Sequence, residues 1–396
     1  MLESYQLNHK NIPCGVLLID PDSHTVESFT NINREVSPFL GNADTRLMKH
    51  WWEARAVPAS RESINELLRQ AGYATTSEYL MKNLALSMTD TYWIQPIDAG
   101  AAWEHVNLHE NSFAGDKIPY HNQTSYDPNA TLGGQMDKYW DTAENPPLLV
   151  KTAYRSYGQQ AINEAFATML HERQSCDVPF VTYGIRSAPD NGIQSFCPAF
   201  TSENVELVPA MEILDSKKIP NRDAIYDTYI TICASHGLDK ELIRDYMDYQ
   251  TLTDFIISNT DRHLMNFGVL RNAETMQFIA PAPIFDSGNS MFYSEHKESA
   301  LTRVGLLERK ITGLYDREEK ILRRVKNRGI VKADLLPSAE ETKQFYASHG
   351  LPEQKAQVIA ENYESKVSLL SEFQKGKTIS LYHEKQRERL SINQGL

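Results

Sequence analysis

Hydrophobic residues in the first part of the chain form short runs separated by turn-forming residues, which is a pattern typical of β-strands. Apolar runs at Pro13–Ile19 and Thr25–Phe29 flank the turn-forming segment Asp20–Ser23. Asp, Pro and Ser favour tight turns because they fix φ or hydrogen-bond to the nearby backbone. This part of the sequence therefore predicts a β-hairpin.

Two helices are expected after the hairpin. Ser60 is placed to cap the first helix and Gly72 to end it. Thr75 and Glu78 have the spacing of a capping box at the start of the second helix. The apolar stripe of the first helix consists of Ile64, Leu67 and Leu68. The first 110 residues thus read as an α/β unit, in which no residue stands out as functional.

The residue composition and the hydrophobic pattern change twice in the middle of the chain. Residues 111–147 are rich in Asn, Gly, Ser and Pro and read as mainly loop. The run Leu148–Val150 predicts a buried strand ending at Lys151, and a helix is expected over 158–173. Its apolar positions recur at helical spacing: Ile162, Ala165, Phe166, Met169 and Leu170. Residues 178–213 resume strand-like patterns.

From residue 223 onward the periodicity is mainly helical, and a final helix is expected from Glu353 to about Gln374. A strand-rich half followed by a helix-rich half predicts an α+β fold with two lobes.

Composition and charge argue against several classes of protein. The chain has 396 residues, is 41% hydrophobic and carries a formal charge of −12, from 40 Lys and Arg against 52 Asp and Glu. A chain of this acidity is not expected to bind nucleic acid through its general field. No apolar run is long enough to span a membrane, and no signal peptide is expected. The four scattered cysteines are expected to be reduced and buried, which favours the cytoplasm.

The most informative segment is Ser258–Gly268, which places polar residues between two apolar runs. Asp261 and Asn266 lie five positions apart, the spacing of a protein-kinase catalytic loop. In phosphoryl transfer an aspartate receives the proton of the attacking hydroxyl, and a nearby amide oxygen holds Mg²⁺. This spacing is not specific by itself, because a long chain contains several such pairs.

A carboxylate follows at Asp286, between an apolar run and the Ser287-Gly288 turn. Mg²⁺ prefers hard oxygen ligands and takes one or two from the protein, so Asn266 and Asp286 form a suitable pair. The alternative is that Asp286 only caps the turn.

Upstream, Lys151 ends a strand and Glu164 lies on the next helix. A lysine there would meet the ATP phosphates, and a glutamate would orient it. Glu164 lies off the apolar stripe of its helix, so an exposed surface carboxylate is the competing interpretation.

A possible glycine loop precedes the lysine and consists of Gly133, Gly134 and Gln135. Glycines let backbone N–H groups approach phosphate. A Gly-Gly turn without function is equally common.

Together these residues follow the order found in kinases, and their motifs resemble the HipA-like serine/threonine kinases. Three segments carry the resemblance: the catalytic loop Asn259-Thr260-Asp261-Arg262-His263-x-x-Asn266-Phe267, the strand Ala282-Pro283-Ile284-Phe285-Asp286, and the pair Asn163-Glu164. The resemblance covers roughly residues 125–295.

The resemblance implies a bilobal protein-kinase-like fold with an additional N-terminal α/β subdomain. The expected divisions are 1–110 for the N-terminal subdomain, 111–207 for the strand-rich kinase N-lobe and 208–396 for the helical C-lobe.

The implied activity is transfer of the ATP γ-phosphoryl group to a protein serine or threonine, with Mg²⁺. Asp261 would be the catalytic base, Asn266 and Asp286 the Mg²⁺ ligands, and Lys151 with Glu164 the phosphate-binding pair. The segment Phe196–Phe200 falls where the adenine hinge would lie, so Cys197 and Phe200 are expected beside the base.

The resemblance also implies an autophosphorylated hydroxyl near the glycine loop, for which Thr131 and Ser125 are candidates. Members of the family often act as toxins restrained by a small DNA-binding antitoxin, so a partner of that kind is an expectation. His263 is expected to pack within its loop, whereas Arg262 has two roles open: contact with phosphate, or attachment of the loop to the C-lobe.

Three other functions compete with this interpretation. A phosphoinositide-type lipid kinase shares the Asp-Arg-His-x-x-Asn pattern, but a membrane-facing enzyme should be more basic than this chain. Small basic patches at 308–310 and 323–326 count in its favour. A pseudokinase would bind nucleotide without turnover. A metal-dependent hydrolase built on Asp261, His263 and Asp286 lacks a second histidine at ligand spacing.

Overall fold

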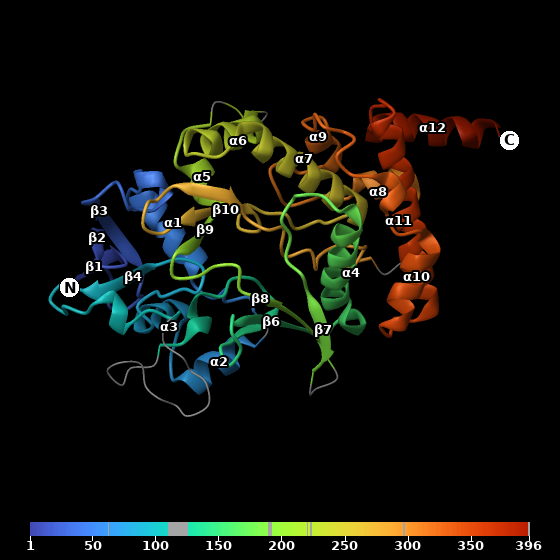
Figure 1. Cartoon of the computed structure of the whole chain (residues 1–396). Coiled ribbons are helices and arrows are strands. Elements are labelled where there is room, and N and C mark those ends of the chain that lie inside the picture. The colour runs from blue at the N-terminus through green and yellow to red at the C-terminus, as the bar shows by residue number, and fades with distance from the viewer. Residues whose placement is uncertain are drawn as a thin grey trace.

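The computed structural model describes residues 1–61, 63–109, 126–188, 192–219, 221, 224–295 and 298–394. Three antiparallel sheets and a set of C-terminal helices succeed one another along the chain (Figure 1). The mixed α/β, two-lobed architecture predicted from the sequence is confirmed. Among the described helices, none combines the length and the apolarity of a membrane-spanning segment.

The N-terminal subdomain is built on a sheet with the strand order β3-β2-β1-β4. The predicted hairpin is confirmed, with Leu17 of β2 opposite Phe29 of β3. The strands are β1 (Glu3–His9), β2 (Ile12–Ile19), β3 (Val26–Asn31) and β4 (Tyr92–Pro96). The helices are α1 (Thr45–Arg55), α2 (Ile64–Ala71) and α3 (Thr76–Lys82).

The predicted ends of these helices agree with the structure in part. Gly72 ends α2 with a φ of 78°, and the Thr75 side chain caps α3 by accepting from the Glu78 amide. Ser60 does not cap α2, because that helix begins three residues later than predicted, after Ser63. Helix α1 was not predicted from the sequence pattern.

A second sheet has the strand order β5-β6-β8-β7, and helix α4 packs against its strands β6 and β8. Its elements are β5 (Asp137–Asp141), β6 (Leu148–Ala153), α4 (Gln159–Gln174), β7 (Gly184–Ser187) and β8 (Ile193–Pro198). Strand β6 and helix α4 lie close to their predicted positions. Strand β5 corrects the prediction that residues 111–147 are mainly loop; residues 110–125 lie outside the described residues.

The third sheet, of order β11-β10-β9, leads into the helical lobe. Its strands are β9 (Val205–Pro209), β10 (Gly268–Asn272) and β11 (Phe278–Pro281). The helices are α5 (Ala210–Asp215), α6 (Ile225–Ser235), α7 (Lys240–Ile257), α8 (Arg303–Glu308), α9 (Glu318–Leu322), α10 (Ala339–Ser348), α11 (Glu353–Gln374) and α12 (Leu381–Gln394). Helix α11 has its predicted bounds but is not the last, and α5 replaces the end of the region predicted as strand-like.

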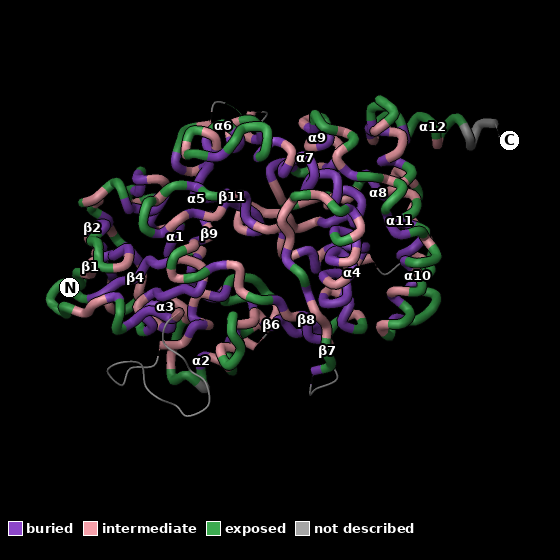
Figure 2. Tube along the Cα trace, in the orientation of Figure 1, coloured by how far each residue is buried: buried purple, intermediate pink, exposed green. Residues whose placement is uncertain are grey.

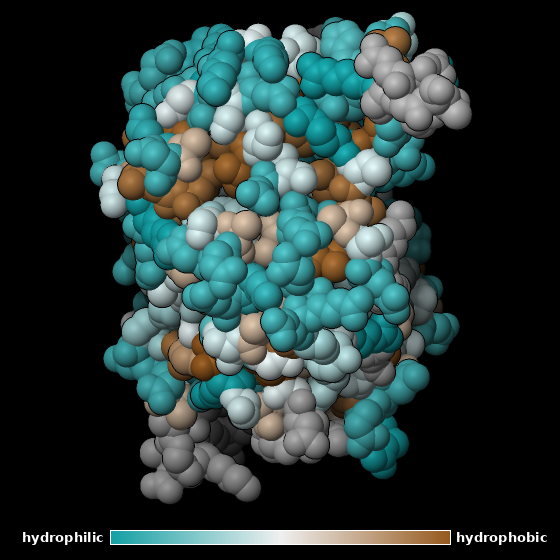
Figure 3. All heavy atoms as spheres, turned by 90° about the vertical axis from the view of Figure 1, so that its right-hand side faces the viewer, coloured by the Kyte–Doolittle hydropathy of each residue, from teal (hydrophilic) through white to brown (hydrophobic). Residues whose placement is uncertain are grey.

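Short 3₁₀ segments complete the described fold at Phe39–Gly41, Trp103–His105, Pro128–Thr131, Ser156–Gly158 and Ala333–Leu335. The C-terminal helices present a mainly hydrophilic outer face, with hydrophobic side chains visible between the hydrophilic ones (Figure 3).

Helix α4 is central to the packing because it is covered on two sides. One side faces strands β6 and β8, and the opposite side carries Phe166 into a cluster of rings from Phe345, Tyr346 and Tyr363. Most of the helix is therefore buried (Figure 2). Asn163 and Glu164 of this helix are fully buried, and a buried polar group requires a partner.

Candidate active site

A cleft of about 1140 Å³ lies between the lobes and is lined by nearly all of the residues singled out in the sequence. Small-molecule sites usually measure about 300–1,000 Å³, so this cleft has room for a nucleotide and for part of a second substrate. The predicted residues that line it are Gly133, Gly134, Gln135, Lys151, Cys197, Phe200, Asp261, Asn266 and Asp286.

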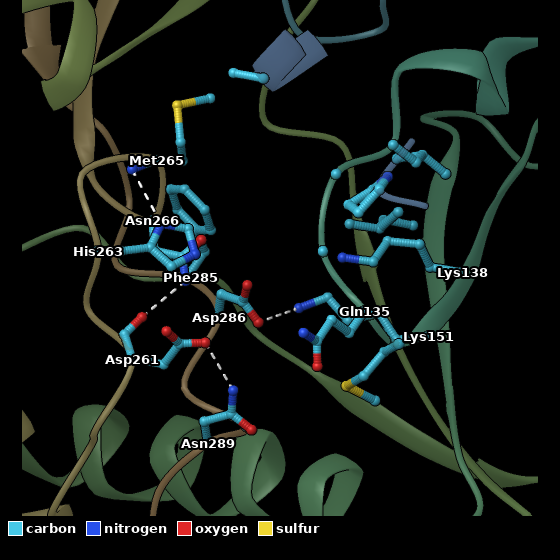
Figure 4. Close-up of a pocket in the computed structure, with 18 of the residues that line it drawn as sticks. Gln135, Lys138, Lys151, Asp261, His263, Met265, Asn266, Phe285, Asp286 and Asn289 are labelled. Carbon is cyan, nitrogen blue, oxygen red and sulfur yellow. Dashed lines mark hydrogen bonds and ion pairs between the residues drawn. The ribbon is translucent and has the colours of Figure 1, made fainter. Parts of the chain in front are cut away.

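Lys151 lines the cleft and forms ion pairs with two carboxylates, of which Asp286 is shown in Figure 4. Its Nζ is 2.6 Å from Glu164 Oε1 and 2.8 Å from Asp286 Oδ1. Strand β6, helix α4 and the segment after β11 thus converge on one ammonium group.

Glu164 is completely buried, so its interpretation as an exposed surface carboxylate is wrong. Its Oε1 accepts from Lys151, and its Oε2 accepts a short hydrogen bond from the Ser195 hydroxyl on β8. The side of α4 without the apolar stripe faces the sheet, which is why a carboxylate there is enclosed.

These charges stabilise one another in the closed environment. Burial alone would lower the pKa of Lys151, but Asp286 and Glu164 outweigh it and raise that pKa well above its ordinary value. Burial would likewise raise the pKa of Asp286, yet the nearby Lys151 and Lys138 hold it well below the ordinary carboxyl range. Lys151 is therefore a cation and Asp286 an anion at neutral pH.

Asp286 has a strained backbone, with a φ of 56° that side-chain-bearing residues seldom adopt. Its N–H donates to the Tyr183 hydroxyl at 3.2 Å. Backbone strain of this kind is retained where the surroundings enforce it, and it is frequent at functional sites.

The catalytic-loop segment is held from both sides. Arg262 forms two bonds to the Asp254 carboxylate on α7, at 2.9 and 3.0 Å, and also donates to the carbonyls of Asn266 and Phe285. Of its two open roles, the structure thus places Arg262 in the attachment of the loop to the C-lobe. His263 lines the cleft, and its Nδ1 accepts from the Met265 amide at 3.2 Å.

Asp261 points into the cleft beside Asn289 (Figure 4). Asn289 donates to Asp261 Oδ2 at 2.7 Å, and Gln160 on α4 in turn donates to Asn289 Oδ1 at 2.7 Å. Asp261 Oδ1 has no hydrogen-bond partner among the described residues. One carboxylate oxygen is therefore fixed, while the other is available to a substrate.

Asn266 has a similar arrangement. Its amide nitrogen donates to the Asp261 carbonyl at 2.9 Å, which leaves its oxygen without a partner among the described residues. Asp286 Oδ2 also has no hydrogen-bond partner among the described residues, since Lys151 donates only to Oδ1. An amide oxygen and a carboxylate oxygen are ligands that suit Mg²⁺. No cluster of three or more His, Cys, Asp or Glu with metal-binding geometry occurs in the described ranges, but Mg²⁺ at a phosphate needs only one or two protein ligands.

Sequence reasoning missed Lys138, and it named Asn163 in a motif without predicting its contacts. Lys138 on β5 extends into the cleft without an ion-pair partner among the described residues, and burial lowers its pKa to about 8. Asn163, fully buried, donates to the carbonyls of Gly288 and Ser290, both at 2.8 Å, and so fixes the segment that follows Asp286. Lys138 was missed because the largely polar strand β5 was not predicted, and the hydrogen bonds of Asn163 to backbone carbonyls leave no sequence signal.

The segment predicted as the adenine hinge contributes to an apolar part of the cleft lining. Cys197 on β8 lies opposite Leu149, and the rings of Phe200 and Phe285 are 5.5 Å apart. These side chains belong to one small cluster with Val181 and Tyr183. Thr131 also lines the cleft, whereas Ser125 lies outside the described residues.

Comparisons with known proteins give similarity in structure only. No family model and no curated protein matches the chain. Among solved structures, it is similar to the proinflammatory kinase CtkA of Helicobacter pylori, with a TM-score of 0.45 and 14% identity over 63% of this chain and 95% of that chain. It is also similar to a structure of the Shewanella oneidensis toxin–antitoxin system HipA, HipB and its operator DNA, with a TM-score of 0.48 and 12% identity over 94% and 91%.

At these identities the similarity concerns the fold, and the geometry of the cleft carries the functional argument.

Proposed function

We propose that this protein is an ATP- and Mg²⁺-dependent serine/threonine kinase of the HipA type. The observation that carries the proposal is the ion-pair geometry around Lys151, which brings Glu164 and Asp286 to one amine beside Asp261. A lysine–glutamate pair next to a metal-binding aspartate is the arrangement that protein kinases use for phosphoryl transfer from ATP.

Each part of the nucleotide has a corresponding part of the cleft. The adenine lies against the apolar wall of Leu149, Cys197 and Phe200. The phosphates lie between the glycine loop and the ammonium groups of Lys138 and Lys151. Asn266 and Asp286 would hold Mg²⁺, which when bound would neutralise charge on the phosphate oxygens.

Asp261 orients the acceptor hydroxyl with its unpaired carboxylate oxygen. The hydroxyl oxygen forms a bond to the γ-phosphorus as the bond to the β-phosphate oxygen breaks, and the hydroxyl proton passes to Asp261. The products are ADP and a phosphorylated side chain. The Asn289 contact keeps Asp261 in position throughout.

A protein acceptor is proposed over a lipid because the chain carries a formal charge of −12, which does not favour an anionic membrane surface. Thr131 is proposed as an internal acceptor, since it lines the cleft directly before the glycines. A small DNA-binding partner stays a prediction for this chain.

The test is incubation with γ-labelled ATP and Mg²⁺, with a generic protein acceptor in one arm and phosphoinositide vesicles in another. Label on protein that is lost in both Asp261→Asn and Asp286→Asn supports the proposal. Label on lipid alone assigns a lipid kinase, and ATP binding without transfer to any acceptor assigns a pseudokinase. Equal labelling by all three proteins removes both aspartates from the mechanism.

A further inference from the structure

One side chain of the N-terminal subdomain reaches the back of the glycine loop. Arg61, which is only 2% exposed, donates from Nη2 to the carbonyls of Leu132, Gly133 and Gly134, the last two at 3.3 and 3.1 Å. Its Nε also donates to the Gly134 carbonyl at 3.2 Å. Three consecutive peptide carbonyls therefore point toward one guanidinium group.

The orientation of the carbonyls fixes the orientation of the amides. In a trans peptide the N–H points opposite to the C=O of the preceding residue. The N–H groups of Gly133, Gly134 and Gln135 thus point away from Arg61. All three residues line the cleft and Arg61 does not, so the loop stands between the guanidinium and the cleft.

These three amides have no hydrogen-bond partner among the described residues. Successive N–H groups that face the same side form a concave anion-binding site. Gly134 has a φ of 85°, which favours glycine. A Cβ atom at this position would also lie 2.8 Å from the Lys138 amine, so the ammonium group stands beside the same loop.

Arg61 is not neutralised by a carboxylate in the described ranges, because all of its hydrogen bonds go to peptide carbonyls. Its charge therefore adds positive potential behind the amides. Two residues further on, the Ser63 hydroxyl bonds to the carboxylate of Asp137, the first residue of β5. The segment before α2 thus holds the glycine loop at its centre and at its far end.

We propose that Arg61 is a positioning residue that presents the glycine-loop amides to the phosphates of the bound nucleotide, and that through it the N-terminal subdomain sets the affinity for nucleotide phosphate. This inference rests on the proposed kinase function, since it assumes that ATP occupies the cleft. Arg61 is expected to affect the binding of the nucleotide phosphates and not the binding of the base.

The experiment compares wild type, Arg61→Ala, Arg61→Lys and Arg69→Ala by calorimetric titration with ATP, ADP and adenosine in the presence of Mg²⁺. Arg69 is the matched control, because it is an exposed arginine on α2 that pairs only with Glu66 in the described structure. Melting temperatures of the four proteins are measured in the same buffer.

Loss of charge-assisted hydrogen bonds to the loop is expected to weaken ATP binding on the order of 10- to 100-fold in Arg61→Ala. Adenosine binding should not change, and Arg69→Ala should match wild type. Arg61→Lys keeps the buried cation but lacks the planar fork, so its loss should be intermediate.

Two results would overturn the inference: ATP affinity of wild-type strength in Arg61→Ala, or equal losses for ATP and adenosine in folded protein. If Arg61→Ala does not fold, the same comparison is made with Arg61→Lys. A loss of ATP affinity without a loss of adenosine affinity supports the inference, and unchanged ATP affinity or equal losses overturn it. If wild type itself does not bind ATP, the proposed function fails first, and the two failures are thereby distinguished.

Discussion

Lys151 on β6 and Asp286 after β11 form an ion pair of 2.8 Å across the cleft, although 135 positions separate them in the chain. Glu164 pairs with the same amine at 2.6 Å. Lys151 and Glu164 are buried in this charge cluster, and Lys151 and Asp286 line the cleft. Because removing one member of such a cluster leaves an unpaired charge, the pair is sensitive to substitution in predictable ways.

Replacing Lys151 should remove the central cation of the site. Lys151→Met is expected to lower phosphoryl transfer by roughly two to four orders of magnitude, since the amine stabilises phosphate charge in a site of low dielectric. Initial rates with labelled ATP measure the effect. Lys385→Met, an exposed lysine on α12, serves as control and should behave as wild type. A loss of less than tenfold in Lys151→Met would contradict the assigned role.

Lys138 should give nucleotide binding a distinctive pH dependence. Burial lowers its pKa to about 8, so the ammonium form present at pH 7 is lost as the pH rises through that value. ATP affinity should therefore fall between pH 7 and pH 9, by at most about tenfold per pH unit above the pKa. Titrations at three pH values measure the slope.

Lys138→Arg supplies the control for this slope, because a guanidinium stays charged throughout the range. The variant should bind ATP with little change between pH 7 and pH 9, and adenosine binding by wild type should also be flat. An identical slope in wild type and Lys138→Arg would remove Lys138 from the phosphate site.

Asn289 should affect catalysis more than nucleotide binding. It donates to Asp261 at 2.7 Å and does not belong to the predicted nucleotide contacts. Asn289→Ala is expected to lower kcat about tenfold or more with a nearly unchanged KM for ATP, because the orientation of the base is lost. Steady-state kinetics with a protein acceptor separate the two constants. A rise in KM at constant kcat would assign Asn289 to ATP binding instead.

The docking of the N-terminal subdomain should depend on Glu206. This buried carboxylate accepts from Arg271 at 2.9 Å, from the Thr91 amide at 2.8 Å, and also pairs with His9. Removing one partner of a buried charge pair costs roughly 3–5 kcal/mol, so Glu206→Gln should unfold at a clearly lower temperature at pH 7. The exposed Glu274 of the Lys10 pair is the control, and Glu274→Gln should cost under about 1 kcal/mol.

The sign of the pH effect at Glu206 follows from its pKa. Burial would raise this pKa, but Arg271 and His9 hold it well below its ordinary value. The stabilisation is therefore present above the ordinary carboxyl pKa of about 4 and is lost as the pH falls below it. The difference in melting temperature between wild type and Glu206→Gln should shrink in acid. A constant difference from pH 7 to pH 3 would contradict this explanation.

The residues proposed to bind the phosphates and the metal could be placed in order from the sequence, because catalytic side chains recur at fixed spacings near strand and helix ends. The burial of Glu164 was harder to predict, because α4 is covered on two sides and its hydrophobic stripe marks only one of them. Strand β5 was missed because it lies at a sheet edge and its sequence, Asp137–Asp141, is largely polar.

Arg61 and Asn163 show a second limit of sequence reasoning. Both act by donating to backbone carbonyls, and a carbonyl is the same for every residue type. No spacing of side chains signals such contacts, so only the folded chain reveals them.

The central claim is that Lys151, Asp261, Asn266 and Asp286 surround a single metal–triphosphate group. Crystals grown with Mn²⁺ and a non-hydrolysable ATP analogue test it directly, because Mn²⁺ is located by its anomalous scattering. We expect the Mn²⁺ peak within coordination distance of Asn266 Oδ1 and Asp286, with the γ-phosphate facing Asp261. A nucleotide bound elsewhere, or a metal peak away from both ligands, would contradict the account.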